Sequence, residues 1–110
     1  MTYTVVTLPE AEVDFHKLYQ YISERSVQGA HAWANAFSDA FRKLEHNPLS
    51  YSLAPESADV DDDVYQIIFK TRRGNPYRLL FSVRNERVFI WAVRGFHQDY
   101  ASDLNDIELP

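Results

Sequence analysis

The sequence predicts an α+β fold in which a helical hairpin packs on a mainly antiparallel sheet, in the order β-α-α-β-β-β. Three observations predict it: a short β-branched run at the start, two consecutive segments with apolar residues at helical spacing, and three closing segments rich in β-branched and aromatic residues. The 110 residues include no repeat or linker, so we expect one domain over residues 1–110. A chain of this size buries roughly two-thirds of its unfolded surface, which is enough for an independent core.

The first strand is expected at Tyr3 to Leu8, followed directly by a helix. The run Thr7-Leu8-Pro9-Glu10 fits a capping box, in which the Thr7 hydroxyl and the Glu10 carboxylate each bond the other residue's backbone N–H. Pro9 is compatible with the first helical turn. The helix then presents one apolar face, formed by Ala11, Phe15, Leu18, Tyr19 and Ile22.

A second helix is predicted after a break at residues 26–29. Its apolar stripe has the helical spacing of Ala30, Trp33, Ala34, Phe37, Phe41 and Leu44. We expect it to end at Asn47, because Pro48 disfavours the α conformation in the residue before it. Helical spacing alone explains the aromatic residues, so they are interpreted as core rather than as a cofactor site.

Residues 48–63 are predicted to form a loop, since they contain Pro48, Pro55 and several serines. The aspartates at positions 59 and 61–63 lack the ligand spacing of a calcium loop. We therefore interpret this segment as a solvated acidic connector and expect no metal site.

The remaining chain is predicted to form three strands at residues 64–71, 77–83 and 88–94, joined by a turn at 72–76 and a tight hairpin at 84–87. If Val83 pairs with Val88, one face should take the helices. That face carries Tyr77, Leu79, Phe81, Val83, Val88, Ile90 and Ala92. The other face carries Arg78, Leu80, Ser82, Phe89, Trp91 and Val93, and its cover cannot be assigned from the pattern.

Composition excludes several function classes. The absence of cysteine excludes disulfides, thiolate metal sites and cysteine nucleophiles. No apolar run approaches the roughly 20 residues of a membrane helix, and the N-terminus lacks signal-peptide features. We expect a cytoplasmic protein with no membrane partner, no metal and no cofactor.

Charge is segregated along the chain although the total is −5. Residues 64–97 carry seven basic residues against one acidic residue, whereas residues 1–63 carry four against eleven. This distribution predicts one basic surface on an acidic body, suited to RNA, DNA or an acidic protein. The alternative is a sheet face neutralised by the acidic segments.

Three sequence motifs carry a family resemblance. They are the strand-to-helix junction of residues 3–10, the run Leu44-Glu45-His46-Asn47-Pro48, and the run Tyr77-Arg78-Leu79-Leu80-Phe81. In this order and spacing the chain resembles the RelE/ParE superfamily of bacterial toxins, over essentially its whole length. The resemblance implies a growth-inhibiting, plasmid-stabilisation-type toxin of a type II toxin–antitoxin system. It also implies a cognate antitoxin as partner, with a homodimer or a heterotetramer as the compatible assemblies.

The superfamily divides into two target classes. RelE-like members cleave mRNA in the ribosomal decoding site, and ParE-like members poison DNA gyrase. For RNA cleavage, the resemblance assigns catalytic roles to Arg78, Arg94, His97 and Tyr100, while residues Lys70, Arg72 and Arg73 are candidates for clamping phosphates of the target.

Two of these residues, Arg78 and His97, also have a plain structural interpretation. Arg78 is equally well explained as a cation paired with Asp61, Asp62 or Asp63, and a lone histidine such as His97 is more often a surface residue than a catalyst. The predicted register places Arg78 and Arg94 on opposite faces of the sheet. We therefore expect a ParE-like toxin acting on gyrase, with an RNA-cleaving enzyme as the alternative and a non-toxic interaction module as the second alternative.

The partner surface is predicted from the sheet face that the helices leave uncovered. Leu80, Phe89 and Trp91 should form an exposed apolar patch beside Arg78, which is the kind of surface that marks a binding site. We expect the antitoxin to cover it with apolar anchors surrounded by acidic residues.

Overall fold

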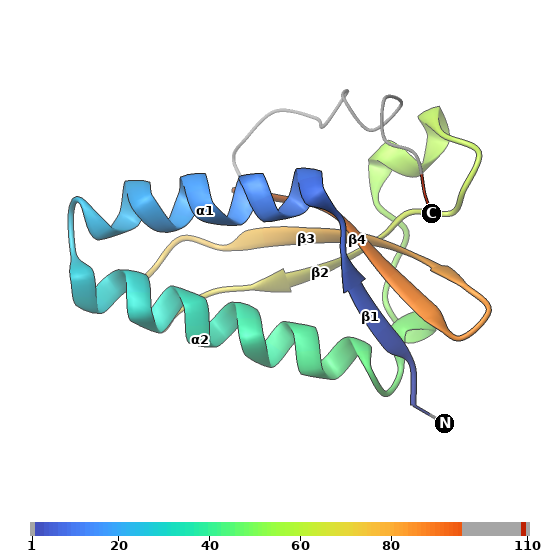
Figure 1. Ribbon diagram of the computed structural model, residues 1–110, viewed down its shortest axis with the longest axis horizontal. Coiled ribbons are helices and arrows are strands. Elements are labelled where there is room, and N and C mark those ends of the chain that lie inside the picture. The colour runs from blue at the N-terminus through green and yellow to red at the C-terminus, as the bar shows by residue number, and fades with distance from the viewer. Residues whose placement is uncertain (1, 96–108, 110) are drawn as a thin grey trace.

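The computed structural model describes residues 2–95 and residue 109. The helices are α1 (Pro9–Ser23) and α2 (Val27–Leu44), and the strands are β1 (Thr4–Thr7), β2 (Tyr65–Phe69), β3 (Tyr77–Arg84) and β4 (Arg87–Gly95). Two short 3₁₀ turns, η1 (Pro48–Ser50) and η2 (Pro55–Asp59), lie between α2 and β2. This is the predicted order of elements, shown in Figure 1.

The strands form one mixed sheet with the order β1-β4-β3-β2. Strand β1 runs parallel to β4, whereas β2 with β3 and β3 with β4 are antiparallel. The predicted tight hairpin is confirmed: Arg84 pairs with Arg87, and Asn85 between them adopts a positive φ of 57°, which asparagine tolerates better than most residues. The mainly antiparallel α+β fold is therefore confirmed.

The two helices begin in different ways. Ser26 caps α2, since its hydroxyl accepts a 2.9 Å hydrogen bond from the backbone N–H of Gly29. The predicted capping box of α1 is wrong: the N-cap is Leu8, and no side-chain hydrogen bond caps the helix. Thr7 is still part of β1, where it pairs with Ile90, so it is not in position to cap. Helix α2 ends at Leu44, three residues before the predicted end.

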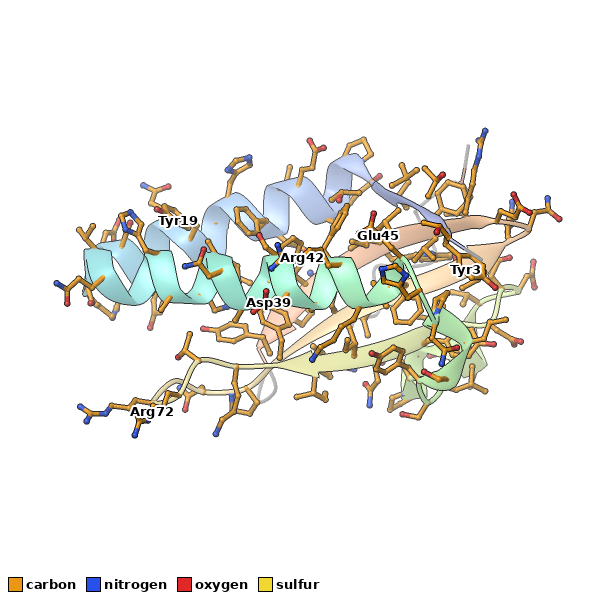
Figure 2. All side chains as sticks on the ribbon, turned by 90° about the horizontal axis from the view of Figure 1, so that it is seen from below. Tyr3, Tyr19, Asp39, Arg42, Glu45 and Arg72 are labelled. Carbon is orange, nitrogen blue, oxygen red and sulfur yellow. The ribbon has the colours of Figure 1, made fainter. Side chains whose placement is uncertain are left out.

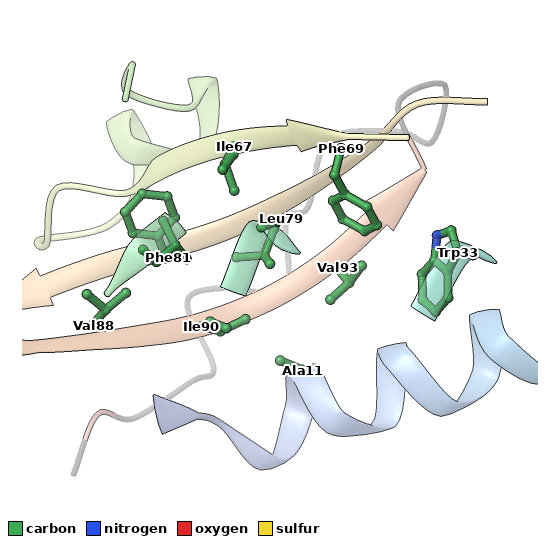
Figure 3. Close-up of a cluster of buried hydrophobic side chains, with 11 residues drawn as sticks. Ala11, Trp33, Ile67, Phe69, Leu79, Phe81, Val88, Ile90 and Val93 are labelled. Carbon is green, nitrogen blue, oxygen red and sulfur yellow. The ribbon is translucent and has the colours of Figure 1, made fainter. Parts of the chain in front are cut away.

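Both helices lie on one side of the sheet, as Figure 2 shows. Figure 3 shows the apolar cluster between them and the strands, to which Phe81, Leu79, Ile90 and Val88 contribute fully buried side chains. Trp33 of α2 is in ring contact with Phe69 of β2, at a centroid distance of 5.9 Å. The aromatic stripe predicted for α2 is thus part of the core.

The other face of the sheet is covered by the segment of residues 48–64, here called the η segment. Ala54 and Val64 of this segment pack with the sheet residues Leu80, Phe89 and Trp91. A backbone hydrogen bond of 2.7 Å from Ala54 N to Val64 O closes the η segment on itself. The predicted loop is confirmed, but it is not merely a solvated connector, because it packs on the sheet face opposite the helices.

A β-bulge corrects the predicted register at one end of the β3–β4 pair. The prediction holds from the hairpin to the pair Phe81 and Ile90, but the next pair is Leu80 with Ala92, so Trp91 is the extra residue. Beyond it, Val93 lies in the cluster under the helices and Ala92 in the cluster under the η segment, the reverse of the prediction. A bulge leaves little trace in an apolar run, which is why the pattern did not indicate it.

Candidate functional site

Arg78 is buried in a carboxylate clamp. It lies on β3 under the η segment with 8% of its surface exposed, and its guanidinium donates to both oxygens of Glu56, from Nη1 to Oε1 at 2.9 Å and from Nη2 to Oε2 at 2.7 Å. A further bond of 3.2 Å runs from Nη1 to Oε1 of Gln66 on β2. Such a two-pronged pair fixes the planar guanidinium in place and neutralises its charge.

The acidic partner predicted for Arg78 was the wrong one. Glu56, only 1% exposed, fills this role, while Asp62 forms an ion pair of 2.9 Å with Arg84 at the end of β3. Glu56 lies on η2, before the three predicted partners Asp61, Asp62 and Asp63. Its signal was weak: one acidic residue directly after Pro55, in a segment whose path across the sheet the sequence does not show.

Arg94 is paired with a carboxylate from helix α1, whereas Arg78 is paired with one from the η segment. Asp14 of α1 forms an ion pair with the Arg94 guanidinium, and the same Asp14 oxygen accepts a hydrogen bond of 3.1 Å from the backbone N–H of Val93. Strand β1 pairs with β4 only as far as Ile90, so Asp14 takes over the hydrogen bonding of the β4 edge where β1 has ended. Asp14 lies off the apolar face of α1, so helical spacing gave no sign of this role.

The bulge makes Arg78 and Arg94 direct cross-strand partners. The expectation that they lie on opposite faces is therefore wrong. Their side chains nevertheless bond to different elements, Arg78 to the η segment and Arg94 to α1. The backbone brings the two cations together, and the carboxylates of Glu56 and Asp14 compensate both charges.

Two of the four candidate catalytic residues, His97 and Tyr100, lie outside the described residues. Their predicted roles stay predictions. The geometry of the candidate site therefore rests on Arg78 and Arg94 alone.

The candidate target-binding cations lie at the turn between β2 and β3. Lys70, Arg72 and Arg73 are exposed, and within the described part of the chain they form no ion pair. Figure 2 shows the Arg72 side chain extending away from the molecule at this turn. Because Arg78, Arg84 and Arg94 are paired with carboxylates, the basic surface is smaller than the charge count predicted, and this turn is its clearest part.

The predicted exposed patch does not exist. Leu80, Phe89 and Trp91 are 0%, 3% and 3% exposed, and the indole N–H of Trp91 donates a 2.7 Å hydrogen bond to the Ser82 hydroxyl. The η segment already covers this face. Exposure of these side chains as a partner surface was predicted wrongly, because the residue pattern does not indicate what covers them.

A cavity of about 410 Å³ opens between the α1–α2 turn and the β2–β3 turn. Tyr21 of α1 and Arg25, just after that helix, line one side of the cavity. Arg73 of the β2–β3 turn and Tyr77 at the start of β3 line the other side. Burial, and then the neighbouring Tyr21, raise the pKa of Tyr77 above its ordinary value of 10.0, so the phenol is neutral and available as a donor near neutral pH. The cavity leaves no signal in the sequence, because its walls are about 50 residues apart in the chain.

Neither a metal-binding cluster nor a membrane-spanning helix is found in the described part of the chain. No group of three or more His, Cys, Asp or Glu side chains there could hold a metal ion. Among the described helices, none is long and apolar enough to cross a membrane.

Known proteins are similar to this chain in sequence and in fold. The sequence model of the family described as "ParE toxin of type II toxin-antitoxin system, parDE" matches residues 5–100. The E. coli toxin RelE, in the free state of a double mutant, has a similar fold, with a TM-score of 0.59 and 18% identity over 96% of this chain and 93% of that one. A chain of the RelBE2 toxin–antitoxin complex from Mycobacterium tuberculosis has a TM-score of 0.47 and 29% identity over 86% of this chain and 99% of that one. No curated protein sequence matches this chain at a significant level.

Proposed function

The chain belongs to the family of ParE toxins of type II toxin–antitoxin systems, and from that premise we propose that it arrests bacterial growth by acting on DNA gyrase. The observation that carries the proposal is the family match over residues 5–100, which covers most of the chain. The similarity to RelE concerns the fold and does not by itself select a target.

The state of the strand arginines supports a binding function over RNA cleavage. Metal-free cleavage of RNA needs cations that can approach the charged transition state. Arg78 is enclosed, with Glu56 on both of its terminal nitrogens, and Arg94 is bonded to Asp14. Neither guanidinium is presented as a free cation, so they are better suited to hold the sheet to its covering elements.

The exposed turn of Lys70, Arg72 and Arg73 is the proposed contact for the acidic target, here the gyrase–DNA complex. These side chains are free to meet an anionic surface, and surface cations raise the rate of such encounters. We further propose a cognate antitoxin as partner, as the description of the family implies.

Bacterial growth during expression tests the proposal that the chain is a toxin. Induction of the chain alone should arrest bacterial growth, and co-expression of the small protein encoded next to it should restore growth. Normal growth despite verified expression of folded protein would contradict the proposal and favour a non-toxic interaction module.

A paired assay tests the target. Purified protein should inhibit supercoiling by gyrase or trap cleaved DNA, while translation in vitro continues. Joint replacement of Lys70, Arg72 and Arg73 by alanine should weaken the inhibition, whereas Arg87→Ala, at the β3–β4 hairpin, removes an exposed cation elsewhere and should not. Equal inhibition by the triple variant would remove the turn from the interface.

One observation favours the RNA-cleaving alternative, namely the cross-strand pairing of Arg78 with Arg94. If the protein cleaved mRNA on ribosomes and left gyrase active, this alternative would replace the proposal. His97→Ala should then lower the cleavage rate by about 100- to 10,000-fold, the usual loss for a general acid or base.

A further inference from the structure

Strand β2 is one of the two outer strands of the sheet, and only part of its outer edge is paired. Near the start of the strand, the Gln66 N–H donates to the Ser52 carbonyl at 3.0 Å, and Leu53 pairs with Tyr65. From Ile67 onward, no strand or backbone hydrogen bond meets this edge among the described residues. The η segment therefore covers the beginning of the edge and leaves the rest open.

The alternation of the backbone identifies the open groups. In an antiparallel strand, the N–H and C=O of one residue point to one side, and those of the next residue point to the other side. The Gln66 N–H points outward, since it bonds to Ser52. Two residues further, the N–H and C=O of Ile68 also point outward, whereas those of Ile67 and Phe69 point to β3. Within the described part of the chain, Ile68 thus presents a donor and an acceptor without a partner.

This stretch of β2 lacks the features that usually protect an outer strand. Proline, a charged residue, a bulge or a covering element normally prevents another chain from pairing with such an edge. The strand reads YQIIF, and no register shift interrupts its pairing with β3. The side chain of Ile68 is also exposed, at 43%. An open apolar edge of this kind is suited to β-augmentation, in which an extended peptide adds a further strand to the sheet.

The side chains around the open edge define the chemistry of the added strand. A cavity of about 280 Å³ lies between α2 and β2, and its lining includes Asp39, Lys43 and Lys70. Asp39 is paired with Arg42, whereas the two lysines are exposed and form no ion pair within the described residues. Figure 2 shows α2 alongside β2, with Asp39 and Arg42 on the helix. The edge is therefore apolar at Ile68 and cationic around it.

From these observations we propose that the open edge of β2 docks an extended segment of a partner protein, with an apolar residue beside Ile68 and acidic residues flanking it. The backbone of the segment bonds to the N–H and C=O of Ile68 and continues the sheet. Its carboxylates pair with Lys43 and Lys70. Because Lys70 also belongs to the proposed target contact, the segment and the target exclude each other; this consequence, unlike the docking itself, rests on the proposed function.

Charge separates this occupant from a second copy of the chain. Pairing of β2 with its own copy brings two sets of Lys43 and Lys70 to one interface, and like charges on adjoining strands are destabilising. An acidic segment meets the same cations with opposite charge. The open backbone groups suit both occupants, so the charged side chains decide between them.

Hydrogen exchange of single amides tests the docking on the whole chain. The probe is the peptide acetyl-Glu-Val-Glu-Ile-Glu-Val-Glu-amide. At a peptide concentration of about 10 times the Kd, exchange of the Ile68 amide should slow by about 10-fold, because only the unbound fraction exchanges. The amides of Ile67 and Phe69 face β3 and should change little. This measurement does not involve gyrase, so failure of the docking is distinct from failure of the proposed function.

Two results of the exchange experiment would overturn the proposal. One is an Ile68 amide that exchanges slowly in the free protein, or equally fast with and without peptide, since the edge would then be closed or unused. The other is protection that increases with protein concentration alone, since this would assign the edge to a second copy of the chain.

Two control peptides separate strand addition from charge attraction. The first has the same side chains on an N-methylated backbone, which cannot donate hydrogen bonds, and it should not bind. The second has lysine in place of each glutamate and should bind more weakly than the parent peptide. Equal binding of the N-methylated peptide would contradict strand addition, and equal binding of the lysine peptide would contradict an acidic occupant.

Variants of the protein locate the contacts. Ile68→Pro removes the outward N–H, which an edge strand tolerates, and should abolish peptide binding. Lys43→Ala and Lys70→Ala should each weaken binding by up to about 5-fold, the usual limit for an ion pair exposed to solvent. Lys17→Ala removes an exposed lysine of α1 and should leave binding unchanged. The lysine variants change only exposed side chains, so they test the site even where Ile68→Pro does not fold. Equal weakening by all three would indicate general charge attraction and contradict the site.

Discussion

The face of the sheet under α1 and α2 and the face under the η segment bury their side chains by different chemistry. The helix-covered face is formed by apolar and aromatic residues such as Phe81, Leu79 and Trp33. The η-covered face mixes apolar residues with buried polar ones, namely Arg78, Glu56 and Ser82. The helices cover their face mainly with apolar stripes, with the Asp14–Arg94 ion pair at the edge of β4, whereas the η segment also attaches through a buried ion pair in the middle of its face.

This difference changes how Arg78 is interpreted. On the basis of sequence it occupies the position of a catalytic strand arginine, yet it holds the η segment on the sheet through Glu56. The lesson is that a charged residue in a strand can be a structural part of whatever covers that strand.

Glu56→Ala should be the most damaging change on the η-covered face. It leaves the Arg78 guanidinium buried without its carboxylate partner, a change that typically costs about 3–5 kcal/mol of unfolding free energy. The double change Glu56→Leu with Arg78→Met removes both charges and should recover most of the loss. Urea unfolding of the three proteins measures the difference; an undiminished loss in the double variant would show that packing, not charge pairing, is at stake.

A matched pair of tryptophan changes compares the two faces directly. Trp33→Phe and Trp91→Phe delete the same atoms, but among the described residues only the Trp91 indole has a hydrogen-bond partner, the Ser82 hydroxyl. Trp91→Phe should therefore lower the unfolding free energy by about 1 kcal/mol more than Trp33→Phe does, because this is the usual net contribution of a hydrogen bond. Thermal or urea unfolding measures this difference in unfolding free energy. Adding Ser82→Ala to Trp91→Phe should lower the unfolding free energy only slightly further. An equal loss for the two single variants would erase the distinction between the faces.

A smaller effect is expected where the same kind of ion pair is exposed. The side chains of Arg84 and Asp62 are 49% and 27% exposed, so solvent screens the pair that ties the η segment to the end of β3. Asp62→Ala should lower the unfolding free energy by less than about 1 kcal/mol. A loss as large as that of Glu56→Ala would mean that burial does not determine the strength of these pairs.

The smallest effect should come from Tyr77 on the helix-covered face. Its pKa is raised in the folded protein by burial and then by Tyr21, so the folded state holds the phenol proton more tightly than the unfolded state does. This contribution to stability is complete below about pH 10 and is lost as the pH rises through the folded-state pKa. Between about pH 9 and pH 11, Tyr77→Phe should lose less stability than the parent protein, as measured by urea midpoints. The same decline in both proteins would assign it to other groups.

The sequence by itself determined the order of elements, the helical hairpin, the hairpin of Arg84 to Arg87 and the family. These features rest on local periodicity, on turn residues and on short motifs, and each acts within a few residues of the chain. Trp33 and Phe81 were assigned to the core correctly, because helical and strand spacing alone placed them there.

Only the tertiary structure decided the surroundings of the candidate site. The bulge at Trp91 made Arg78 and Arg94 partners, and the path of the η segment placed Glu56 on Arg78 and buried Leu80. A one-residue shift in register exchanges the faces of every residue beyond it, and it leaves composition unchanged. Irregular segments carry no periodicity from which their path can be predicted, so contacts between residues 22 positions apart, such as Glu56 and Arg78, arise only when the chain folds.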